Sequence, residues 1–538
     1  MRTKPEIQHH PRSFKSLEPD KKNEVRFSPP TVAFAAALLF SPFVGWAGGV
    51  VTNCTESDLR NAMAGGGTVT FACDGTITLA NTITNESDTV LDASGHQVSI
   101  SGGNAVRALF VNTNTALTLV NLTMANGRSD KGGAIFDEGF LNAINCLFSD
   151  NVVSNGDFHG NLPMISSGGA IYNAGTAVVS GCTFLHNQAM GVTYPGPAPE
   201  GGQGRGGAIC NIGVLRVDGS LFVSNEAIGL WGKRGQDWLG TSGSPGASGF
   251  GGALFNGGVV TLVNSTISSN NCIGGAGGWG GDGPYSMAGV ERVYLGPGGN
   301  GGAGGSGLGS GIYSDGYPAM LTNCTVAFNS ATGGMGGYGG GGSPPGGTGA
   351  NGTAGGAIHL SAGSLLINDI VAANSPSNCS GILSDLGHNL SSDSSGGFTN
   401  STSLTNTNPK LGLLTDNGGP TPTIALLSGS PAIDAGDTAA APPTDQRGFP
   451  RPAGAAADIG AFEYGSMLPV LAVSRIDTVR LDITAYGNMG QSCRLLTSTD
   501  LLNWIPIATN QLSGDGTVVF HDNYNPGIAR MFYRLAMP

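Results

Sequence analysis

The sequence predicts an all-β fold, a solenoid in which successive turns of short parallel strands stack on one another. Three observations predict it: a repeated glycine motif, a second motif at a nearly fixed distance after it, and strand periodicity within each copy. The first motif, Gly-Gly-Ala followed by an aliphatic residue, recurs from Gly132, Gly168, Gly206, Gly251 and Gly355, with a variant at Gly309. Self-similarity of this kind is the signature of a repeat architecture, so one array can absorb most of the 538 residues.

The second motif begins 13 or 14 residues after the first glycine of each copy, and an asparagine stands six residues further on. From the second motif to the next glycine pair, by contrast, the gap varies from 23 to 45 residues. Fixed spacing on one side and free spacing on the other predict a rigid coil whose insertions all leave from one corner. The asparagines are Asn151, Asn187, Asn225, Asn270, Asn329 and Asn374.

Within each copy, apolar residues alternate with small or polar ones, as in residues 177–184 and 259–267, which is strand periodicity. Turns of roughly 22 residues built from three short strands and stacked in parallel form a β-helix. Identical amides about 4.8 Å apart can then donate along a column and satisfy turn carbonyls. Because an unpaired buried amide costs about 1–3 kcal/mol, we expect the asparagines to form a structural ladder rather than a catalytic site.

Two further sets of columns follow from the repeat. A polar column is expected to cap another turn, and it contains Asp137, Asn173, Asn211, Asn256 and Ser314. Two apolar columns should point inward and stack, each member contributing roughly 1.5–3 kcal/mol on burial. They are Ile135, Ile171, Ile209, Leu254, Ile312 and Ile358, and then Phe148, Phe184, Phe222, Ile267, Val326 and Val371.

The paired motif resembles a known repeat. Gly-Gly-Ala-Ile followed by Phe-x-x-Asn, at residues 148–151, 184–187 and 222–225, is similar to the repeats of chlamydial polymorphic outer-membrane proteins. The resemblance covers residues 132–374 and implies a right-handed parallel β-helix, a pectin-lyase-like solenoid, displayed outside the cell. The last three copies replace the aromatic residue but keep the asparagine. The family's terminal barrel does not carry over, because too few residues follow Tyr464.

Residues 1–47 have the pattern of a secretory signal peptide: seven basic residues, an apolar run over 32–44, and small residues at Gly45 and Ala47. A run of about thirteen residues is short for a membrane span, so a retained signal anchor is the less favoured alternative. Removing these residues leaves 17 basic and 32 acidic side chains, a net charge of −15. Such a surface repels nucleic acid and anionic lipid. The sequence predicts a secreted or surface-associated bacterial protein with no nucleic-acid partner and no integral membrane segment beyond the signal.

Residues 48–130 are predicted to form an N-terminal cap and the first rungs, with a short helix over 57–64. We expect a disulfide between Cys54 and Cys73, which an exported location permits and which would add about 3 kcal/mol. Cys146, Cys182 and Cys324 share one position of the repeat, where other copies have serine or aspartate. Buried free thiols are therefore favoured over a zinc site.

After the repeats of residues 131–378, residues 379–465 contain Ser-Pro-Ala-Ile-Asp-Ala-Gly from Ser430, Thr-Asp-Gln-Arg-Gly-Phe-Pro-Arg from Thr444 and Asp-Ile-Gly-Ala-Phe-Glu-Tyr from Asp458. Together these resemble the C-terminal region of the bacterial choice-of-anchor Q family, exported β-helix proteins with differing C-terminal attachments. We interpret this block as a cap. Its charged residues fit a structural Arg–carboxylate network better than a ligand site; they are Asp434, Asp445, Arg447, Arg451, Asp458 and Glu463.

Residues 466–538 change to ordinary alternating strands, which predicts a small β-sandwich of five or six strands. The segment from Ser498 to Trp504 is similar to one found in C-terminal, fibronectin-type-III-like modules of exported bacterial proteins. The resemblance implies a sorting or attachment module.

The repeats lack the residues that β-helix lyases and hydrolases require. Lyases need clustered carboxylates for calcium with an Arg or Lys base, and hydrolases need two or three close aspartates. The repeats contain no Asp-Asp pair and no Arg-x-Lys, and their acidic residues fall at different offsets. We therefore predict no catalytic residues, no metal and no cofactor. The one hint of Ca²⁺ is the single copy Gly-Gly-Asp-Gly from Gly280.

The remaining candidate for a functional site is a set of four glycine-rich insertions. They are residues 191–205, 226–250, 273–308 and 331–354. Glycine makes up 16 of the 36 residues in 273–308, yet aromatic residues lie among the glycines. On one lateral face these rings would suit sugar stacking or protein adhesion; the alternative is that they pin the loops onto the solenoid. The candidate ligand-binding residues are Trp231, Trp238, Trp279 and Tyr285, accompanied by Tyr294 and Tyr338.

The sequence thus predicts an exported β-helix scaffold for cell-surface or extracellular binding and adhesion, with a polysaccharide or a surface protein as its partner. A carbohydrate-active enzyme of the same fold is the alternative function, and a purely structural envelope protein is the third.

Overall fold

The structure is a computed structural model that describes residues 48–154, 165–192, 202–288, 290–467, 470–475, 480–487, 490, 492–513, 516–523, 528 and 530–536. The predicted signal, residues 1–47, lies outside the described residues. No helix within these described ranges is both long and apolar enough to cross a membrane.

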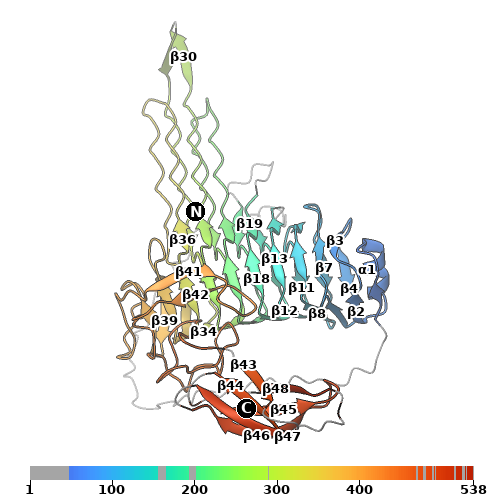
Figure 1. Ribbon diagram of the computed structural model, residues 1–538. Helices are drawn as coiled ribbons and strands as arrows, with labels where there is room; N and C mark the ends of the chain where they lie inside the picture. The colour runs from blue at the N-terminus through green and yellow to red at the C-terminus, as the bar shows by residue number, and fades with distance from the viewer. Residues whose placement is uncertain are drawn as a thin grey trace, which may run out of the picture. The chain divides into compact units, whose positions relative to one another are not determined.

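The chain forms a parallel β-helix, as the sequence predicts, whose rungs follow one another in chain order (Figure 1). Most rungs contribute two consecutive strands to the largest sheet, and those at its two ends contribute one. Its 18 strands are β1 (Val50–Val51), β2 (Gly67–Phe71), β4 (Ile83–Asn85), β5 (Thr89–Asp92), β7 (Leu109–Val111), β8 (Ala116–Val120), β11 (Ile135–Asp137), β12 (Phe140–Ile144), β16 (Ile171–Asn173), β17 (Thr176–Ser180), β21 (Ile209–Asn211), β22 (Val214–Asp218), β26 (Leu254–Asn256), β27 (Val259–Val263), β33 (Ile312–Ser314), β34 (Ala319–Thr322), β37 (Ile358–Ile367) and β39 (Cys379–Asp385).

A second parallel sheet, here called sheet B, takes one strand from each rung. Its members are β3 (Gly75–Thr78), β6 (Val98–Ser101), β9 (Thr123–Ala125), β13 (Leu147–Ser149), β18 (Thr183–Leu185), β23 (Leu221–Val223), β28 (Thr266–Ser268), β35 (Thr325–Ala327), β38 (Ile370–Ala372) and β40 (Leu390–Ser391).

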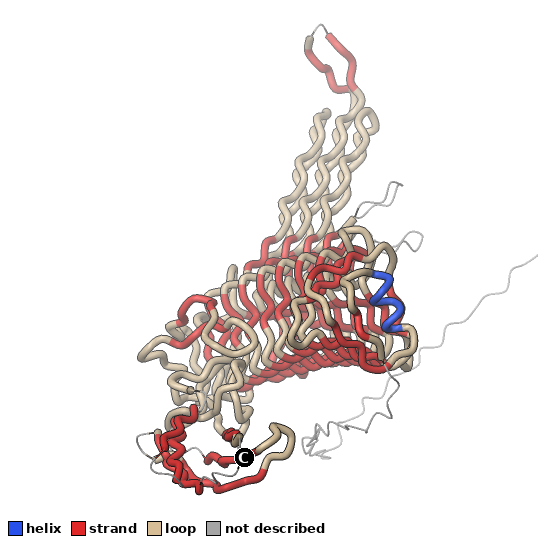
Figure 2. Tube along the Cα trace, turned by 45° about the vertical axis from the view of Figure 1, so that its right-hand side comes forward, coloured by secondary structure: helices blue, strands red, loops and turns tan. Residues whose placement is uncertain are grey.

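Two smaller parallel sheets complete the rungs. Sheet C contains β10 (Arg128–Ser129), β14 (Val152–Val153), β19 (Gln188–Met190), β24 (Glu226–Ile228), β29 (Asn271–Ile273) and β36 (Ser330–Thr332). Sheet D contains β15 (Ile165–Ser167), β20 (Gln203–Arg205), β25 (Gly249–Phe250) and β32 (Gly307–Leu308). The glycine-rich loops leave between sheets C and D, which is the single corner that the variable spacing predicts (Figure 2).

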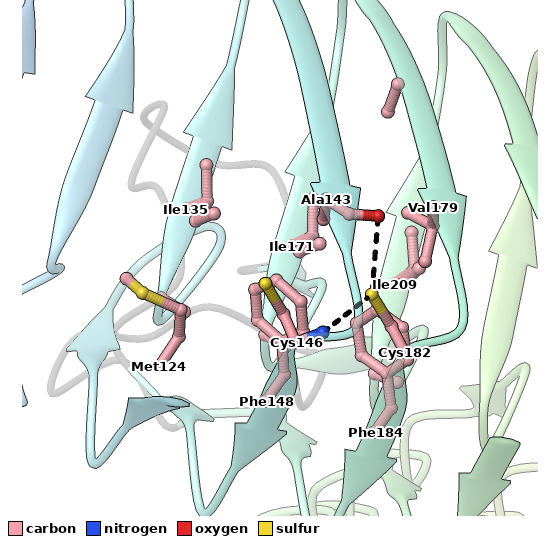
Figure 3. Packing of buried hydrophobic residues seen from close by; sticks show 14 of the residues in the cluster. Met124, Ile135, Ala143, Cys146, Phe148, Ile171, Val179, Cys182, Phe184 and Ile209 are labelled. Atoms are coloured by element: carbon pink, nitrogen blue, oxygen red, sulfur yellow. Dashed lines mark hydrogen bonds between the residues drawn. The ribbon is translucent and has the colours of Figure 1, made fainter. Parts of the chain in front are cut away.

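The core is built from the two predicted apolar columns. Ile135, Ile171 and Ile209 pair in register in β11, β16 and β21, and all are fully buried. The rings of Phe148, Phe184 and Phe222 stack nearly parallel, with centroids 4.8 and 4.7 Å apart. Figure 3 shows the first two. A sandwich of parallel rings is not the arrangement that aromatic pairs prefer, so the rung spacing of about 4.8 Å imposes it.

The asparagines form a continuous ladder at the turn between sheets B and C. Asn151 Nδ2 donates to Asn187 Oδ1 at 2.9 Å, and the same bond recurs at 2.9–3.0 Å through Asn225, Asn270, Asn329 and Asn374. Each amide also donates to a backbone carbonyl, as Asn187 does to Phe148 O. The side chains of the ladder therefore satisfy the buried carbonyls of the turn.

The second polar column is a shorter ladder that begins with an acid. Asn173 Nδ2 donates to Asn211 Oδ1, and Asn211 Nδ2 donates to Asn256 Oδ1, both at 2.7 Å. One rung earlier, Asp137 accepts from Gly139 N, but its Oδ2 and the Oδ1 of Asn173 have no partner among the described residues. Burial raises the pKa of Asp137 to about 7. A proton on Oδ2 would let Asp137 donate to Asn173 as each asparagine donates to the next.

Asp137→Asn is expected to raise the free energy of unfolding by about 1–3 kcal/mol at pH 8, by satisfying the buried acceptor on Asn173. Because the pKa of Asp137 is higher in the folded state than its ordinary 3.8, the stability that its proton supplies is complete below pH 4 and is lost as the pH rises through 7. The variant should equal the wild type at pH 4. Urea unfolding at pH 4, 6 and 8 measures both effects; identical pH profiles for the two proteins would contradict the interpretation.

The N-terminal end is closed by the one helix of the described residues, α1 (Glu56–Met63). Thr55 caps the start of the helix, since its hydroxyl accepts from Asp58 N, and Leu59 and Met63 are buried against the first rungs. A disulfide joins Cys54 to Cys73 beside it. Covering the first rung removes the exposed strand edge that a solenoid otherwise presents.

The C-terminal block begins as solenoid and then turns back along it. Strands β39 and β40 still pair with the preceding rung, so the solenoid continues to Ser391, beyond the boundary expected at residue 379. The hairpin β41 (Leu411–Thr415) and β42 (Thr423–Leu426) follows. From there the chain lies along the side of earlier rungs: Asn264 and Asn323 donate to the carbonyls of Thr444 and Asp458. The block is therefore a lateral brace as well as a cap.

Residues 470–536 form a small antiparallel sandwich, described here by itself. One sheet contains β43 (Val470–Arg475), β44 (Arg480–Tyr486) and β47 (Thr517–Asn523), and the other contains β45 (Ser492–Ser498), β46 (Ile505–Gln511) and β48 (Phe532–Ala536). Ile483, Cys493, Leu495 and Phe520 are buried between the sheets. Alternating strand residues therefore supply a core of their own.

Candidate functional site: a glycine-rich arm

Three glycine-rich loops, residues 229–248, 274–306 and 333–357, together form one arm (Figures 1 and 2). Each loop runs outward and returns, so the arm contains six backbone segments: 229–237, 240–248, 274–283, 296–306, 333–341 and 346–354. The segments bond to one another at every third residue. Gly275, Gly278 and Gly281, for example, donate to the carbonyls of Ala247, Ser244 and Thr241.

A three-residue hydrogen-bond period identifies extended, three-fold helices of the polyproline II type, which rise about 3.1 Å per residue. The segment 274–283 is accordingly about 28 Å long. Such helices have no internal hydrogen bonds, and here the neighbouring segments supply the partners. The arm is therefore an ordered bundle held together by its backbone.

The glycines are required because the segments approach too closely for any side chain. A Cβ on Gly278 would lie 1.9 Å from Lys233 O, and one on Gly302 would lie 2.0 Å from Ser244 O. Segment 274–283 donates to neighbours on two sides, 240–248 and 333–341, and has glycine at two of every three positions. In segment 229–237, Gly232 and Gly235 donate to one neighbour, and glycine recurs once in three. Glycine thus stands at positions where a neighbouring backbone leaves no room for a side chain.

The outward segments of the three loops lie side by side and present an exposed apolar surface, here called the aromatic face. Its members are Trp231, Trp279, Met335 and Tyr338, which are 73, 57, 72 and 65% exposed. Gly235 N donates to Trp279 O and Gly280 N donates to Tyr338 O, which brings the three segments into register. The rings of Trp279 and Tyr338 meet edge to face at 5.7 Å.

The charged residues of the aromatic face are paired within it. Arg234 binds Asp237 at 3.0 Å, Asp237 Oδ1 accepts from Asp282 N, and Asp282 Oδ1 accepts from Gly341 N. These bonds cross all three outward segments and fix their relative positions. The returning segments differ in chemistry, because their exposed residues are small or polar: Ser242, Pro245, Asn300, Ala303, Thr348 and Asn351.

The far end of the arm is a short hairpin, β30 (Tyr285–Ala288) and β31 (Glu291–Tyr294). The rings of Trp238 and Tyr285 lie 4.6 Å apart, and Arg292 lies 4.6 Å above the Tyr285 ring while binding Asp282 at 2.7 Å. Met287, Val290 and Leu295 are exposed around this cluster. The contact between Trp238, in the first loop, and Tyr285, in the second, therefore joins these two loops at the tip.

The structure divides the four candidate ligand-binding residues into two pairs. Trp231 and Trp279 lie on the aromatic face, whereas Trp238 and Tyr285 pack on each other at the tip. Met335 and Arg234 were not among the candidates. The three-residue glycine period could have identified them, because the exposed side chains of each outward segment occur at one fixed position of that period.

The charged residues of the C-terminal block form a buried network rather than an open site. Arg447 binds Asp445 at 2.7 Å, and Arg451 binds Glu463 at 2.8 Å, with all four side chains at most 5% exposed. Burial raises the pKa of Asp458 to about 7, raises that of Glu463 and lowers that of Arg451. Arg451 also donates to the carbonyls of Asp458 and Gly460. Asp434, the sixth residue of the set, is exposed.

No group of three or more His, Cys, Asp or Glu suited to a metal ion occurs within the part of the chain that the structure describes. The cysteines at one repeat position are buried, and Cys146 N donates to the Cys182 sulfur at 3.3 Å (Figure 3). Burial raises the pKa of Cys182 well above its usual value. Comparison with known proteins finds no matching family model and no matching curated protein.

Proposed function

We propose that the protein is an exported β-helix scaffold that binds a cell-surface or extracellular ligand, a polysaccharide or a surface protein, through the aromatic face of its arm. The observation that carries the proposal is that Trp231, Trp279, Met335 and Tyr338 are all more than half exposed on one ordered surface. An ordered backbone presents these side chains without a loss of loop entropy on binding, which favours affinity.

Charge supports the same proposal. The whole chain has a net charge of −12, whereas the described arm contains three basic and three acidic residues. They are Lys233, Arg234 and Arg292, with Asp237, Asp282 and Glu291. A neutral arm on an acidic protein can approach a negatively charged surface with less repulsion than the rest of the chain.

The resemblances to the choice-of-anchor Q family and to polymorphic outer-membrane protein repeats support the exported, surface-associated location as part of this proposal. The sandwich of residues 470–536 would then serve as the attachment module.

Replacing Trp231 and Trp279 together by Ala is expected to reduce ligand affinity 10–100-fold, because exposed rings at the centre of a binding surface contribute about 1–3 kcal/mol. Purified full-length protein is tested on a glycan array and on immobilised bacterial and host-cell surfaces. Ser242→Ala with Thr348→Ala, at exposed positions of the returning segments, is the matched control and should bind as the wild type does.

Equal loss in both double variants would assign binding to the arm as a whole rather than to the aromatic face. Unchanged binding in the Trp231 and Trp279 variant would refute the proposed function. Release of reducing-end or unsaturated sugars in the same assay would instead establish the enzyme alternative.

A further inference from the structure

A second candidate site lies on the solenoid itself, at the turn between sheets B and C. There a groove of about 690 Å³ crosses successive rungs. Two columns line it. One consists of the left-handed residue before each ladder asparagine, and the other of the residue after it. The first contains Asp150, His186, Ser224, Ser269 and Phe328, and the second contains Val152, Gln188, Glu226, Asn271 and Ser330.

Phe328 is the unusual member of the first column. Its φ is +62°, in the left-handed region, and its side chain is 45% exposed. Bulky side chains rarely adopt this conformation, and the other copies have Asp, His, Ser or Ala there. A strained, exposed ring that neither fills the core nor relieves the turn indicates a functional role.

Phe328 also joins two hollows. It lines the groove and a neighbouring cavity of about 450 Å³ formed with Ala373, Asn406 and Leu411. The ring therefore lies between the two hollows and lines both.

The rest of the lining is polar and spaced by the rungs. Gln188 Nε2 donates to Glu226 Oε2 at 2.9 Å, and Asn271 follows one rung later in the same column. Asp150 and Glu226 are acidic, and no Lys or Arg lines the groove. Hydrogen-bonding groups thus recur about every 4.8 Å beside one aromatic ring, in a setting that repels anions.

We propose that this groove binds a neutral oligosaccharide chain, stacked on Phe328 and hydrogen-bonded by Gln188, Glu226 and Asn271. A run of hydroxyl-bearing rings matches both the repeated polar partners and the single stacking platform. The two carboxylates discriminate against uronate polymers. The site is separate from the aromatic face of the arm and does not depend on the function proposed for it.

The test is isothermal titration of the full-length protein with neutral β-1,4-linked gluco-, manno- and xylohexaose, and with hexagalacturonate for comparison. At least one neutral hexasaccharide should bind, and hexagalacturonate should not. Phe328→Leu keeps the apolar bulk and the backbone strain but removes the ring, and we expect it to weaken binding at least 10-fold. Phe328→Tyr should retain binding, and Gln188→Ala should weaken it.

The Trp231→Ala, Trp279→Ala double variant shows whether the same sugar binds the aromatic face of the arm instead. A loss in that variant together with retained binding in Phe328→Leu would place the sugar on the arm and overturn the groove proposal. Absence of binding by every neutral hexasaccharide, or tighter binding of hexagalacturonate, would overturn it as well. Thermal unfolding of each variant verifies that the solenoid is folded.

Discussion

Gly302→Val is expected to separate the six segments of the arm while leaving the solenoid folded. Gly302 lies at the centre of the bundle, where its N–H donates to Gly278 O and a Cβ would lie 2.0 Å from Ser244 O and 2.4 Å from Ser244 C. Both contacts are to backbone, so neither atom can move without breaking the hydrogen bonds of its own segment. The effect should therefore spread across the arm rather than remain local.

Hydrogen exchange measures this result directly. Amides such as Gly278, Gly305 and Gly337, which donate between segments, should lose protection by at least 100-fold, while those of β17 and β22 keep theirs. Ala303→Val is the matched control, because Ala303 is the adjacent residue but is exposed. Retained protection in the Gly302 variant would show that the bundle is held by something other than close backbone approach. Binding through the aromatic face should fall in parallel with protection.

Arg451→Met is expected to lower the free energy of unfolding by about 3–5 kcal/mol, because it leaves buried carboxylates without their cation. Arg451 and Glu463 are 1 and 0% exposed and 2.8 Å apart, and Arg451 also satisfies the carbonyls of Asp458 and Gly460. Urea unfolding of the full-length chain, observed through the near-UV signal, gives the change.

The matched control is Arg216→Met. Arg216 binds Asp218 at 3.0 Å on the solenoid surface with half of its side chain exposed, and such pairs contribute at most about 1 kcal/mol. If the two substitutions cost the same, the network at residues 445–463 is not the buried, brace-forming structure described here. Adding Glu463→Gln to Arg451→Met should recover part of the loss, since the uncompensated charge is removed.

The solenoid could be predicted from the sequence because the same kinds of side chain must occupy the same position in successive rungs. Phe148, Phe184 and Phe222 stack because each occupies the same place in a rung, and Asn151 and Asn187 bond for the same reason. Each contact joins neighbouring copies of one pattern. A one-dimensional repeat therefore reveals both the fold and its ladder.

The arm and the brace could be predicted less well, for two different reasons. The glycine period of three extends only over short segments of each loop, and the glycine-rich composition is also typical of unstructured chain. The ordered arm, and the place of Met335 on its surface, were therefore not predicted. The brace depends on contacts such as that of Thr266 with Gln446, 180 residues apart, which no local pattern encodes. The left-handed backbone of Phe328 could not be predicted either, because no residue pattern in the sequence encodes it.

The segments of the arm are held together mainly by backbone hydrogen bonds, and this determines which of its residues can change. In segment 274–283 the glycines are fixed by contact with neighbouring backbone, whereas the side chains of Ala276 and Trp279 lie outside that contact. Mutations at these positions leave the framework intact, so they are free to diversify. Substitutions at about one residue in three can therefore change the chemistry of the arm's surface, with no change in fold or in the length of the loops.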